Sequence, residues 1–79
     1  MEVHVKLFAT LRRHYPEMEI GEAMPVELAE GATVDQLLAS MDLPTDQVKV
    51  VFVNGVVQPG DHVLQADDVV GLFPPVGGG

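Results

Sequence analysis

The residues best suited to chemistry lie at 74–79, where the sequence reads PPVGGG. Two prolines favour a stiff, extended segment, and glycines carry no side chain that would block entry into a narrow channel. We expect this segment to carry the α-carboxylate of Gly79 into another protein's active site. A carboxylate becomes an acyl donor once it is activated, for example as an acyl-adenylate, and then accepts a sulfur or amine nucleophile. The residues expected to thread the channel are Pro74, Pro75, Gly77 and Gly78.

The rest of the chain lacks the usual signatures of an enzyme. There is no cysteine, which excludes a thiolate nucleophile, a disulfide framework and a cysteine zinc site. The histidines, His4, His14 and His62, have neither HxxxH nor HxH spacing, and the strand position of His4 predicts a solvated side chain. The pair at residues 67–68 (DD) fits a turn better than a calcium loop, which needs six or more oxygens. We therefore expect no catalytic side chain, no bound cofactor and no metal site.

Charge limits the partners that the chain can bind. Four basic residues face twelve acidic ones, which gives a net charge of −8. Three of the bases, Lys6, Arg12 and Arg13, fall in the first thirteen residues, and Lys49 is the fourth. Phosphate recognition needs clustered Lys and Arg, so we expect neither nucleic acid nor a membrane surface as a partner. The acidic surface either favours a basic partner protein or serves only solubility.

The length of the chain and its targeting signals indicate how many domains it forms and in which compartment it is expected. Seventy-nine residues, 47% of them apolar, suffice for one small domain with a single core. No basic segment followed by an apolar run opens the sequence, and the longest apolar stretch, residues 69–76, is too short to cross a bilayer. Small secreted domains usually need disulfides, so the absence of cysteine favours the cytoplasm.

The hydrophobic pattern predicts an α+β roll of the ubiquitin type. Strands are predicted at residues 3–8, 26–28, 49–53, 56–58 and 69–73, and a short helix at 9–15. The main helix follows Thr33, which forms a capping-box pattern with Gln36, and it ends before Pro44. Its apolar stripe comprises Val34, Leu37, Leu38 and Met41. Asn54-Gly55 predicts a type I′ hairpin turn. The first and last strands are the most apolar, so we expect them to pair at the centre of a mixed four- to five-stranded sheet.

Several short motifs follow one another along the chain. They are residues 6–9 (KLFA) with 11–12 (LR), 30–34 (EGATV) with 37–38 (LL), 53–55 (VNG), 64–69 around Asp68, and 72–76 (LFPPV). Their order and spacing, and above all the FPPVxGG ending, resemble the MoaD/ThiS sulfur-carrier proteins of the β-grasp superfamily. Within that family the likeness is greatest to the small subunit of molybdopterin synthase.

The resemblance implies a route for sulfur. An E1-like adenylating enzyme would activate Gly79 with ATP, and a sulfurtransferase system would convert it to a thiocarboxylate. The tail would then enter the large subunit of molybdopterin synthase and donate its sulfur during molybdenum cofactor biosynthesis. The chain itself would be a non-catalytic donor subunit, with a β-grasp domain at residues 1–73 and a functional tail at 74–79. Partner docking would involve Phe73, Leu72 and Val76.

The sequence departs from the family pattern in two places. Residues 66–68 (ADD) replace the common Asp-Gly-Asp before the last strand, a changed turn with little bearing on activity. Gly77 precedes the usual glycine pair, as in the thiamin-pathway carrier, and this departure leaves other functions open. The alternatives are a ubiquitin-like protein modifier, a sulfur carrier for tRNA thiolation or thiamin synthesis, and an interaction module with an inert tail. Whichever function holds, successive side chains of a strand point to opposite faces of the sheet. We therefore expect either Leu72 or Phe73 to be exposed.

Overall fold

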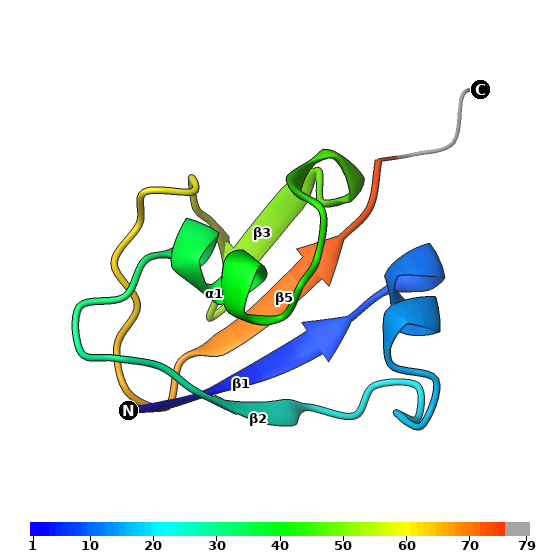
Figure 1. The fold of residues 1–79 in the computed structure, drawn as a ribbon, viewed down its shortest axis with the longest axis horizontal. Helices are drawn as coiled ribbons and strands as arrows, with labels where there is room; N and C mark the ends of the chain where they lie inside the picture. Colours follow the sequence, from blue (N-terminus) through cyan, green and yellow to red (C-terminus); the bar gives the residue numbers. More distant parts are fainter. Residues whose placement is uncertain (76–79) are drawn as a thin grey trace.

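The computed structural model describes residues 1–75 as one roll of strands and short helices (Figure 1). The elements are β1 Glu2–Leu7, η1 Ala9–His14, β2 Met24–Glu27, α1 Val34–Ser40, η2 Thr45–Gln47, β3 Val50–Val53, β4 Val56–Val57 and β5 Val69–Phe73; η1 and η2 are 3₁₀ helices. The sequence predictions for Val76, Gly77, Gly78 and Gly79 lie outside the described residues. Within residues 1–75, no helix is long and apolar enough to cross a membrane.

The strands form one mixed sheet in the order β2-β1-β5-β3-β4. The central pair, β1 and β5, is parallel, with Val5 opposite Val70, and every other pair is antiparallel. Figure 1 shows α1 lying across one face of this sheet. The predicted α+β β-grasp roll is therefore confirmed, including the adjacency of the first and last strands.

The core lies between α1 and the covered face of the sheet. Thr33 caps α1 as predicted, because its hydroxyl accepts the Gln36 N–H at 3.3 Å while the Gln36 side chain accepts the Thr33 N–H at 2.8 Å. The four residues of the apolar stripe are all buried, which confirms the orientation of the helix. The core residues of the strands are Val3, Val5, Leu7, Val51, Val53, Val70 and Leu72.

The turn between β3 and β4 also fixes the start of β5. Asn54 and Gly55 have φ angles of 51° and 85°, as the predicted type I′ turn requires. The Asn54 amide group donates to the Asp68 carboxylate at 2.9 Å, and its oxygen accepts the Val69 N–H at 2.9 Å. The backbone N–H of Asn54 donates to the Val69 carbonyl at 2.8 Å. One turn residue thus joins the hairpin to the last strand.

Several element boundaries differ from the sequence predictions by one or two residues. The segment at 9–14 is a 3₁₀ helix, a geometry typical of short connectors, and only Leu11 in it is buried. Strand β2 begins at Met24 because that residue pairs with Val5 of β1. Helix α1 ends at Ser40, which agrees with the prediction that it ends before Pro44, and Asp42, with φ 56° in the left-handed region, follows its end.

Candidate functional site

The candidate site begins where the central strand ends. At the end of β5 the Phe73 carbonyl accepts the Lys49 N–H at 2.8 Å, and the Leu72 carbonyl accepts the Phe8 N–H at 3.1 Å. The strand is therefore bonded as far as Leu72 on the β1 side and as far as Phe73 on the β3 side. Pro74 follows half-buried and Pro75 exposed. We call residues 73–75 the tail root, because they connect the sheet to the sequence around Gly79.

Three phenylalanines gather beside the tail root, on the face of the sheet opposite α1. The ring of Phe73 stacks on that of Phe8 at a centroid distance of 4.2 Å and an interplanar angle of 4°, and it meets Phe52 edge-on at 5.3 Å. All three side chains are only partly buried. They line an open, mostly apolar groove of ≈ 250 Å³ that we call the aromatic groove. Its other lining residues are Lys6, Gly55, Val69 and Gly71.

Gly71 provides the floor on which these rings lie. It pairs with Phe52 in the β3–β5 register, and its neighbours in the chain point to the other face of the sheet. A Cβ atom at Gly71 would come within 3.3 Å of Phe8 Cε2 and 3.7 Å of Phe73 Cε2. An alanine here would require the Phe8 ring to shift by a few tenths of an ångström, whereas its contact with Phe73 would be an ordinary one, so glycine allows Phe8 to lie close to the strand.

The structure corrects one docking prediction and refines another. Leu72 is fully buried, with 0% of its surface exposed, so its side chain stabilises the core and is not available to a partner. Phe73 is partly exposed on the opposite face, as the alternation within a strand requires. One residue of the pair is therefore accessible, as expected. The predicted docking role of Val76 lies outside the described residues.

Sequence reasoning missed Phe8 and Phe52 as members of the site. The signal for Phe52 was its place between Val51 and Val53, since an aromatic residue alternating with buried valines must lie on the exposed face. The signal for Phe8 was weaker, because it stands after the last residue of β1. Its stacking on Phe73 depends on the parallel pairing of β1 with β5.

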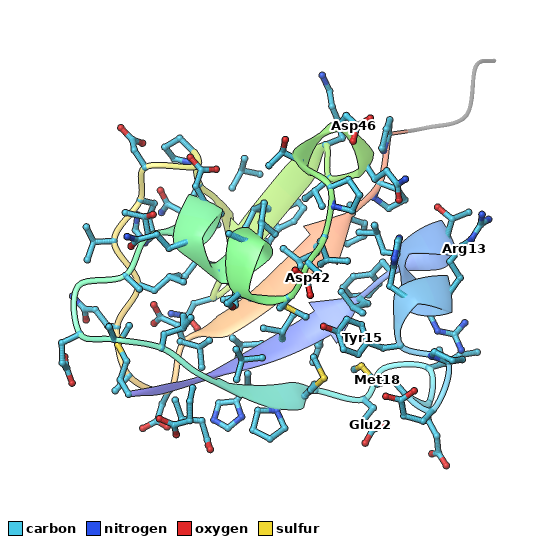
Figure 2. The ribbon with its side chains drawn as sticks, in the orientation of Figure 1. Arg13, Tyr15, Met18, Glu22, Asp42 and Asp46 are labelled. Carbon is cyan, nitrogen blue, oxygen red and sulfur yellow. The ribbon has the colours of Figure 1, made fainter. Side chains whose placement is uncertain are left out.

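The second hollow at the tail root is polar. It is lined by Thr10, Arg13, Asp46, Gln47, Pro74 and Pro75. Figure 2 shows Arg13 on η1 and Asp46 on η2, the two short helices that flank the end of β5. The ring of His14 bonds the side chain of Gln47 at 2.9 Å, which links these two helices. The tail root thus lies between an apolar groove and a polar hollow.

Tyr15 anchors η1 to the body of the fold. Its hydroxyl donates to the Met41 carbonyl at 3.0 Å, at the end of α1, and Figure 2 shows it near Asp42. Burial, and then the negative charges of Asp42 and Glu17, raise the pKa of Tyr15 above its ordinary value. The hydroxyl therefore stays protonated, and able to donate, at neutral pH.

Ligand-type side chains also converge at the far end of β1. The Nε2 atom of His4 lies 3.5 Å from a carboxylate oxygen of Glu2 and 3.6 Å from one of Asp67. Both carboxylates are exposed, so this group makes an ion pair whenever His4 is protonated. Spacing analysis did not find it, because Asp67 reaches His4 only through the pairing of the β1 and β5 segments. The group lies at the end of the sheet away from the tail root.

The fold and the site together define a small ubiquitin-like carrier: a β-grasp roll whose central strand ends, at the tail root, beside an exposed apolar groove. The chain belongs to the ThiS family, whose model matches residues 5–79. Members of this family are small sulfur carriers that are not catalytic on their own, and this chain is one of them. No curated protein gives a significant match.

Solved structures agree with the family assignment. A Pyrococcus furiosus protein assigned as molybdopterin converting factor subunit 1 is 30% identical, covering 96% of this chain and 99% of that one, with a TM-score of 0.74. SAMP1 from Haloferax volcanii is 25% identical over 100% of both chains, with a TM-score of 0.73. A complex of subunits 1 and 2 of the molybdopterin-converting factor from Helicobacter pylori, at 21% identity and a TM-score of 0.62, shares the fold.

Proposed function

We propose that the chain is the small, sulfur-donating subunit of molybdopterin synthase. In this proposal the α-carboxylate of Gly79 attacks the α-phosphorus of ATP on an E1-like enzyme, and pyrophosphate leaves. A sulfide-equivalent donor from a sulfurtransferase system then attacks the acyl carbon, AMP leaves, and a thiocarboxylate remains. The large synthase subunit would accept the tail and pass the sulfur to a pterin precursor.

The observation that carries the proposal is the geometry of the tail root. The central strand is bonded on both sides near its end, and Pro74 and Pro75, which have no backbone N–H to continue the ladder, follow it. The aromatic groove lies directly beside this exit and exposes apolar rings that a partner could cover. A partner bound there would be positioned to receive the residues that follow Pro75.

The chemistry of the sequence supports the same assignment. Without cysteine, the chain cannot hold sulfur as a persulfide, so a carried sulfur must sit on an acyl carbon. The likeness to the Pyrococcus furiosus protein at 30% identity extends over nearly the full length of both chains, and it favours the molybdopterin pathway.

A second candidate is a protein modifier. The match to SAMP1 supports it, because Haloferax volcanii SAMP1 is a small archaeal modifier protein and both chains are covered completely. In that function the activated acyl group of Gly79 would be attacked by a lysine amine to form an isopeptide bond. Sulfur carriage for tRNA thiolation or thiamin synthesis would use the same thiocarboxylate and different acceptors.

Intact mass measurement tests the proposal. The purified chain is incubated with ATP, its cognate activating enzyme and a sulfur source, and we expect the mass to rise by the difference between sulfur and oxygen. Addition of the large synthase subunit with pterin precursor should return the mass to its starting value. Lysine-linked conjugates in place of this return would favour the modifier.

Two length variants test the role of Gly79. A chain that ends at Gly78 shortens the thread by at most about 3.6 Å. That loss is as large as the contact distance of about 3–3.5 Å that reacting atoms require, so activation should collapse. A chain with one residue added after Gly79 should fail as well. Complete thiocarboxylate formation on the shortened chain would exclude Gly79 as the acyl donor.

A further inference from the structure

The charges around the tail root have the opposite sign to the molecule as a whole. Lys6 lines the aromatic groove, Arg13 lines the polar hollow, and the backbone of Lys49 bonds Phe73. Asp46 is the one acidic residue among those lining the two hollows. Three bases and one acid give this surface a net charge of +2.

The remainder of the chain is strongly acidic. Of the four bases and twelve acids in the sequence, one base and eleven acids lie elsewhere, so the remainder carries −10 and the whole −8. The fold creates this separation. Lys6 and Arg13 come from the first part of the chain, and Lys49 reaches the same place through the antiparallel pairing of β3 with β5.

Arg13 and Lys49 are exposed, and Lys6 is partly exposed. Among residues 1–75, no salt bridge to a carboxylate joins any of the three. Their charges are therefore available to a partner: Lys6 lies in the aromatic groove itself, Arg13 in the neighbouring polar hollow, and Lys49 next to the end of β5 through its backbone. An acidic partner surface would be attracted to the tail root and repelled by the rest of the molecule.

We propose that the tail root is an electrostatic guide that selects a partner with acidic side chains around an apolar tail-entry site. This is the reverse of the basic partner that net charge alone suggests. Complementary charges of this kind raise association rates by about 10- to 1,000-fold and favour one orientation of encounter. Here the favoured orientation brings the tail root to the partner first. The inference rests on the proposed function only for the identity of the partner.

The test measures association of the chain with its cognate activating enzyme by stopped-flow, without ATP. Arg13→Glu and Lys49→Glu each change the net charge by −2. The matched control is the double variant Ala29→Glu/Ala66→Glu, which changes the net charge equally at exposed positions away from the tail root. We expect each reversal to slow association about tenfold or more at low salt, and the control to leave the rate within about twofold.

Salt provides the second arm of the experiment. At about 1 M salt the screening length falls to about 3 Å, so the rates of wild type and variants should converge. Arg13→Gln should give an intermediate rate, and circular dichroism confirms that each variant is folded. Equal slowing of association by the control variant would show that only the net charge of the chain matters. Faster association of Arg13→Glu would indicate a basic partner. Either result overturns the proposal. Binding is measured without chemistry, so a failure of adenylation would count against the proposed function alone.

Discussion

Asn54 combines two stabilising roles that a pair of substitutions separates. Its backbone adopts the left-handed conformation of the turn, and its side chain bonds both the Asp68 carboxylate and the Val69 N–H. Asn54→Gly keeps the turn conformation and removes both side-chain bonds. Asn54→Ala removes the same bonds and also forces a Cβ atom into the left-handed region.

The expected losses follow from these contacts. A net hydrogen bond contributes about 0.5–1.5 kcal/mol, and because Asn54 is exposed we take the lower part of that range, about 1–2 kcal/mol for the two bonds in Asn54→Gly. The left-handed conformation adds about 1 kcal/mol for alanine, so Asn54→Ala should lose about 2–3 kcal/mol. These are large fractions of the roughly 5–15 kcal/mol that stabilises a typical domain.

Urea denaturation followed by circular dichroism measures both losses. The midpoint should fall in the order wild type, Asn54→Gly, Asn54→Ala, with an unchanged m-value. Gln65→Ala is the control, because the backbone of this exposed residue, rather than its side chain, bonds Asp68. A wild-type midpoint for Asn54→Gly would show that the side-chain bonds contribute nothing. Equal midpoints for the two variants would refute the cost assigned to the backbone conformation.

Three further predictions concern the core, pH and docking. Leu37→Ala should lower the unfolding free energy by about 2–5 kcal/mol, and an unchanged denaturation midpoint would contradict the core assignment. Because the folded state raises the pKa of Tyr15, the unfolding free energy should decrease as pH rises from about 10 through the folded-state pKa; comparing Tyr15→Phe with wild type at each pH isolates this loss, which the variant should lack. Phe73→Ala should weaken binding to the activating enzyme more than it weakens folding, whereas Ile20→Ala, an exposed apolar control outside the groove, should do neither; calorimetric titration showing wild-type affinity for Phe73→Ala would remove its anchoring role.

Local signals predicted most of the fold. The capping box at Thr33, the apolar stripe after it and the turn at Asn54 each depend on residues a few positions apart, so the sequence contains their full description. The central pairing of the first and last strands was also predicted, from the apolar character of these two strands. The face of the sheet opposite α1 is nevertheless open around the three phenylalanines.

The site was harder to predict because it depends on register. Whether Leu72 or Phe73 faces the core is decided by the pairing of β5 with two distant strands. The same pairing brings Phe8 onto Phe73 and places Lys49 beside the tail root. The net charge of the whole chain did not reveal the basic character of this surface, because it carries no information about where each charge lies in the fold.

The central position of β5 has a consequence for the order of folding. Val5 and Val70 are opposite each other in the sheet, so the β1–β5 pair closes a loop of about 65 residues, at a length-dependent entropy cost of about 4 kcal/mol. The pair β2-β1 and the pair β3-β4 are joined only through β5, which is the last strand to be synthesised. Stable folding must therefore wait for the last strand to be made. A chain interrupted before β5 would expose its unpaired strand edges to proteolysis, so the strand that leads to the tail root is also required for a stable fold.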